Sequence, residues 1–157
     1  MLLTIRSMKQ LHFGKLMEVY LEGNREKECG LLQAEQDFYD YLRQCFFATP
    51  GAVYYVWSEE EQYRSALRLE PYKDGWLLEA LETHPDYRRR GYGKRLVEAV
   101  MALGEYPVIY SHVHKQNEPS LCLHRKVGFT VVAPYAVYID GSMNNRCYTF
   151  RYVRKEE

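Results

Sequence analysis

Residues 84–94 read His-Pro-Asp-Tyr-Arg-Arg-Arg-Gly-Tyr-Gly-Lys, and the interpretation of the whole chain starts from them. A strand-like segment, Trp76 to Thr83, leads into them, and an amphipathic, helix-like segment, Lys94 to Leu103, follows. The first turn of a helix has unpaired N–H groups and a partial positive charge, and glycines let an anion approach the backbone closely. Arginines beside such a turn add charge-assisted hydrogen bonds to phosphate oxygens. The stretch therefore predicts a phosphate-binding loop from Arg88 to Gly93.

The spacing of the glycines excludes two other phosphate-binding loops. A P-loop requires the pattern GxxxxGK[ST], but Lys94, Arg95 and Leu96 follow Gly93. A dinucleotide-binding fingerprint requires GxGxxG, and Leu96 stands where the third glycine would be. What remains is the pattern Arg-x-x-Gly-x-Gly, which begins at Arg88.

This pattern resembles the acetyl-CoA signature of the GNAT superfamily of N-acyltransferases. The Glu-Ala-Leu-Glu-Thr segment at 79–83 and the lead-in at 84–88 are similar to that family as well. A second family element follows downstream, with Asn117, Ser120, Leu123 and the sequence Lys-Val-Gly-Phe at 126–129. A glycine turn beside a solvated basic face is the plain alternative for the loop alone, but it does not predict the downstream element.

The order of elements indicates an α/β fold with a mixed sheet. Hydrophobic periodicity predicts a strand, two helices, three strands, a helix, a strand, a helix and two strands. The resemblance implies a GNAT-like fold, in which a central, mostly antiparallel sheet of about seven strands is flanked by four helices. The predicted strands are Leu2–Arg6, Val53–Ser58, Tyr63–Tyr72, Trp76–Thr83, Val108–Val113, Thr130–Ile139 and Arg146–Val153, and the predicted helices are Leu11–Tyr20, Ala34–Phe47, Lys94–Leu103 and Glu118–Val127.

Length favours a single domain over residues 1–157, and the resemblance implies that it is an acyl-CoA N-acyltransferase domain. Lys plus Arg and Asp plus Glu are 21 each, so the basic excess typical of a nucleic-acid binder is missing. We therefore expect no nucleic-acid partner. No apolar run suits a membrane helix and the first residues do not resemble a signal peptide, so we expect a cytoplasmic protein without a membrane partner. The cysteines form no CxxC pair and suit free thiols: Cys29, Cys45, Cys122 and Cys147.

The resemblance implies acetyl-CoA as the acyl donor and a set of residues that bind it. Backbone groups of the strand at 81–83 would meet the pantetheine arm, and one N–H there would polarise the thioester carbonyl. Backbone N–H groups from Arg89 to Lys94 would hold the pyrophosphate, and Asn117 and Ser120 would contact the pantetheine or adenine side. The expected set is Leu81, Glu82, Thr83, Arg88, Arg89, Arg90, Gly91, Tyr92, Gly93, Lys94, Asn117, Ser120 and His124.

Departure of the thiolate calls for a proton donor, and here the sequence differs from the family pattern. Many relatives carry a tyrosine shortly before the Lys-Val-Gly-Phe turn, and His124 stands there. Histidine has an unperturbed pKa of about 6.5 and can donate a proton near neutrality. A helix histidine that only contacts cofactor or core is the equal alternative. Nearby Cys122 is interpreted as core packing, and His112 and His114 lack a third ligand, so no metal site is predicted.

Glu79 and Glu82 are the candidates for the general base. They are three residues apart on a strand, so regular alternation places them on opposite faces of the sheet, and only one can face an acceptor. A carboxylate in an otherwise apolar strand is costly unless it is paired or hydrated. A salt bridge to Arg68 is the structural alternative, and a chain of waters could replace a dedicated base.

These residues predict an enzyme that transfers acetyl from acetyl-CoA directly to an amine of a small molecule or peptide. The alternative is a catalytically silent acyl-CoA-binding or regulatory module on the same fold, which the change to His124 favours. The tract Glu22 to Glu28 could face a cationic acceptor or be a solvated loop. A homodimer is also an option, because the edge of a terminal strand at Arg146–Val153 could pair with a second chain.

Overall fold

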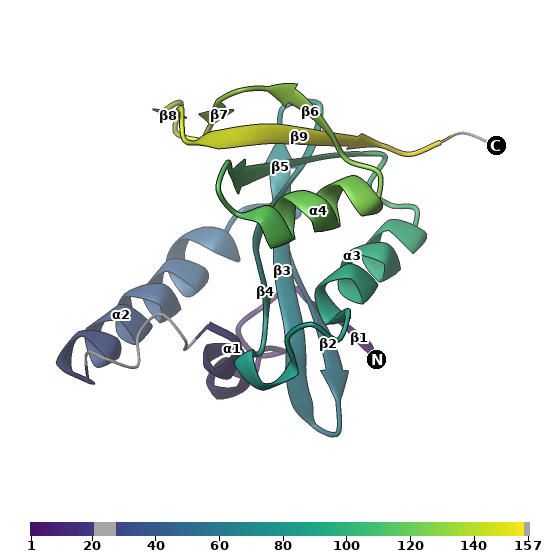
Figure 1. The fold of residues 1–157 in the computed structure, drawn as a ribbon. Helices are drawn as coiled ribbons and strands as arrows, with labels where there is room; N and C mark the ends of the chain where they lie inside the picture. Colours follow the sequence, from purple (N-terminus) through teal and green to yellow (C-terminus); the bar gives the residue numbers. More distant parts are fainter. Residues whose placement is uncertain (21–27, 156–157) are drawn as a thin grey trace. The chain divides into compact units, whose positions relative to one another are not determined.

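In the computed structural model, which describes residues 1–20 and 28–155, one sheet carries seven strands in the order β1-β2-β3-β4-β5-β9-β6 (Figure 1). Strands β4 and β5 run parallel with Trp76 opposite Ile109, whereas β1–β2, β2–β3, β5–β9 and β6–β9 are antiparallel pairs. The predicted mixed, mostly antiparallel sheet is confirmed. Its strands are β1 (Leu2–Ile5), β2 (Val53–Glu59), β3 (Gln62–Tyr72), β4 (Gly75–Thr83), β5 (Val108–His114), β6 (Thr130–Ala133) and β9 (Cys147–Val153).

The described residues contain four α-helices, as predicted. They are α1 (Phe13–Tyr20), α2 (Glu28–Tyr41), α3 (Tyr92–Ala102) and α4 (Glu118–Lys126). A π-helical turn, η2 (Leu42–Phe46), continues α2, and a 3₁₀ turn, η3 (Pro85–Tyr87), follows β4. Among these helices none is both long and apolar enough to cross a membrane.

The second helix begins earlier than the sequence predicted. We expected its start at Ala34 and took Gly30 as a breaker, but Gly30 lies within α2. A glycine lowers helix stability by only about 1 kcal/mol, and a helix of this length tolerates that cost. Of the tract Glu22 to Glu28, residues 22–27 lie outside the described part of the chain.

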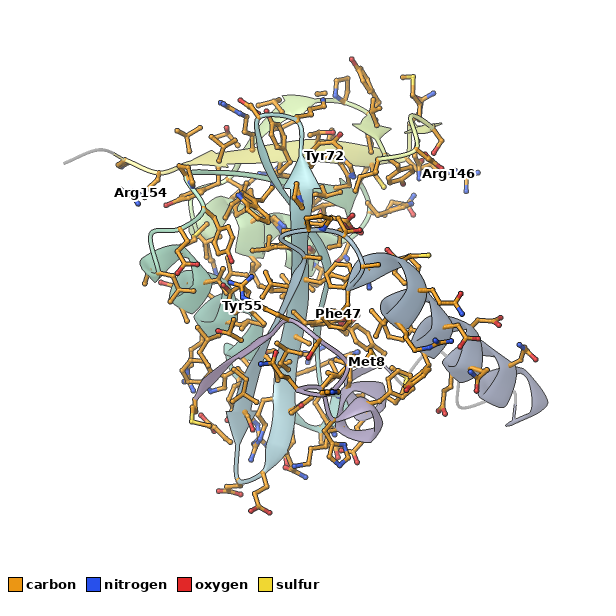
Figure 2. All side chains as sticks on the ribbon, turned by 180° about the vertical axis from the view of Figure 1, so that it is seen from behind. Met8, Phe47, Tyr55, Tyr72, Arg146 and Arg154 are labelled. Carbon is orange, nitrogen blue, oxygen red and sulfur yellow. The ribbon has the colours of Figure 1, made fainter. Side chains whose placement is uncertain are left out.

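Contacts divide the chain into two compact units: Met1–Glu70 with Ala80–Leu96, and Pro71–Glu79 with Val97–Glu157. We call them the first and the second unit and describe each by itself. The core of the first unit contains fully buried side chains from α1, η2 and the β2–β3 hairpin, among them Leu16, Leu42 and Tyr54. Met8 and Phe47, both labelled in Figure 2, pack against this core.

In the second unit, β9 lies between β5 and β6, so the predicted sheet edge at Arg146–Val153 was wrong. Arg146 and Arg154 mark the two ends of this strand in Figure 2. The edge strand on this side is instead β6, which is last in the strand order. The predicted strand Thr130–Ile139 is interrupted at Pro134-Tyr135, so β6 ends at Ala133. Proline lacks the N–H that a ladder needs. The residues after it form β7 (Ala136–Val137), which pairs with β8 (Met143–Asn144) in a separate small sheet.

Candidate functional site

The glycine-bearing loop lies in the first unit, between η3 and the first turn of α3. Two of its residues have left-handed backbone conformations, Arg89 with φ 64° and Gly91 with φ 81°. Such conformations, mixed with right-handed ones, turn successive N–H groups toward one concave side, which is the geometry of an anion nest. A Cβ built on Gly91 would meet no atom within 4 Å, so the space beside its backbone is open. Helix α3 begins at Tyr92, and the N–H groups of a first helical turn generally have no acceptor within their own helix.

The three arginines of the loop differ in their surroundings. Arg88 is held back against the end of β4, where its Nη2 lies 3.3 Å from Oε1 of Glu82 and its Nε donates to the carbonyl of Thr83 at 3.3 Å. Arg89 and Arg90 are exposed, and the guanidinium of Arg90 lies 5.5 Å from the ring centroid of Tyr87. The loop therefore has exposed positive charge beside its nest.

The strand that leads to the loop is irregular at Ala80. This residue has φ 53°, which a side chain rarely adopts inside a strand. The hydroxyl of Tyr20 donates to the Ala80 carbonyl at 2.8 Å and lies 2.6 Å from the hydroxyl of Tyr54. The argument that placed Glu79 and Glu82 on opposite faces assumed regular alternation, and the left-handed residue between them breaks that regularity.

Glu82 keeps the properties expected of a candidate base. Burial raises the pKa of its carboxyl group, and the hydrogen bond from the Thr83 N–H lowers it in part. The ion pair with Arg88 is screened by solvent, since the two side chains are 43% and 39% exposed respectively. Glu79, in the second unit, is partly buried and makes polar contacts of its own. A carboxyl with a raised pKa accepts a proton more readily near neutrality.

His124 in the second unit is 2% exposed, and both of its ring nitrogens have partners. Nδ1 lies 2.7 Å from the backbone carbonyl of Ser120, which can only accept, so Nδ1 carries the proton. Nε2 then accepts from the hydroxyl of Ser111 at 2.8 Å. Burial lowers the pKa of this histidine, although the Ser120 carbonyl opposes the effect. Of the two interpretations that the sequence left open, this geometry favours the packing role.

The other two second-unit candidates shape the start of α4. Asn117 is the N-cap, and its Oδ1 accepts from the N–H of Ser120 at 3.3 Å. The hydroxyl of Ser120 lies 3.3 Å from Nδ1 of His124. These bonds account for the Asn and Ser of the second motif in terms of local structure, and their contact with a cofactor stays a prediction.

Sequence reasoning missed several residues around the loop. Arg64, on β3, is 5% exposed, and its guanidinium lies 3.6 Å from the ring centroid of Tyr87. Glu59 and Ser65 bond to Tyr92 at the start of α3. The signal that could have drawn attention to Arg64 was a charged residue at a position where the strand is otherwise buried.

The fold is a mixed α/β sheet whose fourth strand leads through a loop with left-handed residues into a helix, an arrangement that suits a phosphate-bearing ligand. Residues 16–129 match the Acetyltransferase (GNAT) family, and because this match covers more than half of the chain, the chain belongs to that family. The predicted family is thereby confirmed. A search of curated protein sequences returns no match.

Solved structures share the fold at low sequence identity. PH1933 from Pyrococcus horikoshii OT3 is 13% identical, with a TM-score of 0.71 over 99% of this chain and 100% of its own. The PaiA N-acetyltransferase from Thermoplasma acidophilum, solved in complex with coenzyme A, is 14% identical, with a TM-score of 0.64 over 98% and 99%. The ribosomal-protein-S18-alanine N-acetyltransferase from Escherichia coli is 14% identical, with a TM-score of 0.65 over 100% and 96%.

Proposed function

We propose that this chain is an enzyme that transfers an acetyl group from acetyl-CoA to an amine of a small molecule or peptide. The observation that carries the proposal is the loop with left-handed residues at Arg89 and Gly91, placed before the first turn of α3 in a chain of the GNAT family. The open space beside Gly91 suits a pyrophosphate, because an anion can reach the backbone N–H groups there. The solved neighbour that contains coenzyme A supports the same donor.

The residues of the first unit have separate tasks in this proposal. Backbone N–H groups from Arg89 to Lys94 hold the pyrophosphate, and the exposed arginines add charge. Backbone groups of the strand at 81–83 orient the pantetheine arm and polarise the reacting carbonyl. Bound acetyl-CoA supplies the acetyl group as a thioester. Glu82, with its raised pKa, takes a proton from the acceptor amine directly or through water.

His124 is proposed to hold α4 against β5 rather than to donate a proton, since its one ring proton is bonded to the Ser120 carbonyl. The thiolate of CoA would then leave as the anion and take its proton from water. Asn117 and Ser120 keep their expected contact with the pantetheine or adenine side as part of the proposal. We further propose that residues 1–157 act as one acetyltransferase domain and work in the cytoplasm.

The first test is calorimetric titration of the purified protein with acetyl-CoA, with dephospho-CoA and ATP alongside. Micromolar binding of acetyl-CoA and weak binding of ATP is the expected result, and release of free thiol in the presence of a panel of amines would establish transfer. Binding with no transfer to any amine would favour the silent acyl-CoA-binding module. No binding of acetyl-CoA would overturn the proposal.

A further inference from the structure

We infer that Arg64 is a positioning residue for the phosphate-binding loop. Contacts from the end of the β2–β3 hairpin fix this loop at both of its ends. The inference rests on the proposed function, because it assigns to the loop a donor that carries phosphates. Every residue involved belongs to the first unit.

At the N-terminal end of the loop, the contacts from the hairpin are made to Tyr87. The Arg64 guanidinium covers one face of this ring at 3.6 Å from its centroid, and the Tyr87 hydroxyl donates to Oε1 of Gln62. The backbone carbonyl of Arg64 also accepts from the N–H of His84 at 2.8 Å, so the strand is bonded to the chain just before η3. Tyr87 directly precedes the arginines of the loop and is therefore fixed both at its ring and at its hydroxyl.

At the C-terminal end of the loop, the contacts from the hairpin are made to Tyr92, the first residue of α3. Its hydroxyl donates to Oε2 of Glu59 at 2.8 Å, and its carbonyl accepts from the Ser65 hydroxyl at 3.1 Å. Glu59 also pairs with Arg95 at 3.2 Å, one turn into the helix. The bonds from Trp57 and Tyr92 lower the pKa of Glu59, so its carboxylate stays charged.

The strained part of the loop lies between Tyr87 and Tyr92. A left-handed conformation is unfavourable for a non-glycine residue, and Arg89 adopts one at φ 64°. Strained conformations persist only where the surroundings over-determine them. Fixing Tyr87 and Tyr92 supplies that restraint and sets the direction of the N–H groups in advance, so a bound pyrophosphate would not have to order the loop.

The burial of Arg64 indicates a role beyond filling space. A buried charge is unfavourable unless it is well compensated, yet the ion pair that Arg64 makes among the described residues is with Glu60 at 3.5 Å, whose side chain is 87% exposed. Glu59 also attracts the guanidinium. Its Nε is buried without a hydrogen-bond partner among the described residues. The cation–π contact with Tyr87 is the close compensating contact, and the planar guanidinium of arginine can in addition stack on the ring, which a lysine ammonium cannot do.

The test compares two donors that differ in the part that the loop would hold. Acetyl-CoA carries the pyrophosphate, and S-acetylpantetheine carries the same thioester arm without phosphates. We expect Arg64→Met to raise the Kd for acetyl-CoA about tenfold, the factor expected from losing a desolvated cation–π contact. The Kd for S-acetylpantetheine, followed by ligand-observed NMR, should be unchanged. Arg64→Lys keeps the charge but not the planar stacking on the ring. It should weaken the binding of acetyl-CoA to a similar degree.

Two further variants keep the test decisive if Arg64→Met does not fold. Tyr87→Leu and Glu59→Gln each remove the contacts at one end of the loop, and both positions are partly exposed. Both variants should lose affinity for acetyl-CoA but not for S-acetylpantetheine. Arg43→Met, at an exposed arginine of the same unit, is the matched control and should bind both donors normally. Equal weakening of both donors, or no change in either, would overturn the inference. Wild-type protein that binds S-acetylpantetheine but not acetyl-CoA would overturn the proposed function as well.

Discussion

The hydroxyl of Ser111 on β5 donates a 2.8 Å hydrogen bond to Nε2 of His124 on α4. His124 also packs against Phe129 and Phe150, with ring centroids 5.0 Å and 5.3 Å away. The side chain of His124 thus joins a helix to the sheet, and Figure 1 shows α4 beside β5 and β9.

Replacing His124 should therefore affect stability and its pH dependence. Burial lowers the pKa of His124 in the folded protein, so between that value and about 6.5 the unfolded chain binds more protons. This contribution to the free energy of unfolding is fully present above about pH 6.5 and is lost as the pH falls through the folded pKa. His124→Gln should flatten the dependence in denaturant titrations across this range.

The comparison is best made in a His112→Gln background, because burial also lowers the pKa of His112. If His124→Gln left the pH dependence of that background intact, the packing role would be contradicted. If the acetyl-transfer rate fell by orders of magnitude in a fully stable His124→Gln protein, His124 would have to be the proton donor to the thiolate.

Gly91→Asp should abolish detectable binding of acetyl-CoA. The substitution places a side chain and a negative charge in open space beside the nest, at φ 81°. Gly141→Asp is the matched control, since Gly141 also has a positive φ, 87°, and nothing within 4 Å of a built Cβ. The control carries the same backbone strain and charge in another loop, so calorimetry should find its affinity for acetyl-CoA unchanged. Equal affinities in the two variants would remove the loop assignment.

Glu82→Gln should remove one limb of the pH–rate profile. Burial raises the pKa of Glu82 above its usual value of about 4.3, so the basic form, and with it kcat/KM, grows as the pH rises through that raised pKa. The amide cannot accept the proton, and the rate should fall about 10²–10⁴-fold. Glu79→Gln is the paired variant. If the pH–rate profile is unchanged in Glu82→Gln but altered in Glu79→Gln, the general base is Glu79. If the profile is unchanged in both variants, a chain of waters acts in place of a dedicated base.

Gly75→Ala should destabilise the second unit. A Cβ at Gly75 would lie 2.3 Å from the backbone carbonyl oxygen of Val108, on the paired strand, and backbone cannot move aside as a side-chain end can. Overpacking of this kind costs about 1–3 kcal/mol of unfolding free energy, measured from the denaturation midpoint and slope. Gly14→Ala, where the nearest atom is the end of the His12 side chain at 3.3 Å, is the control. A wild-type midpoint for Gly75→Ala would contradict the close packing of β4 on β5.

The sequence by itself determined the family, the order of strands and helices, and the place of the loop. These features follow from local patterns: alternation for strands, three- and four-residue spacing for helices, and glycines before a helix start. Its errors were also local in origin. The strand predicted through Pro134 and the helix start after Gly30 came from weighing single residues without knowing what they pack against.

The tertiary structure alone decided which side chains act together. Arg64 contacts Tyr87, and Glu59 contacts Tyr92, although the two residues of each pair are far apart in sequence. Ser111 on β5 and His124 on α4 are also brought together by the fold, and the Ser120 carbonyl fixes which ring nitrogen of His124 carries the proton. The left-handed turn at Ala80, which breaks the alternation between Glu79 and Glu82, has no sequence signal, because alanine does not favour it. Long-range packing and backbone irregularity therefore set the chemistry of the site, and a pattern of neighbours along the chain cannot encode them.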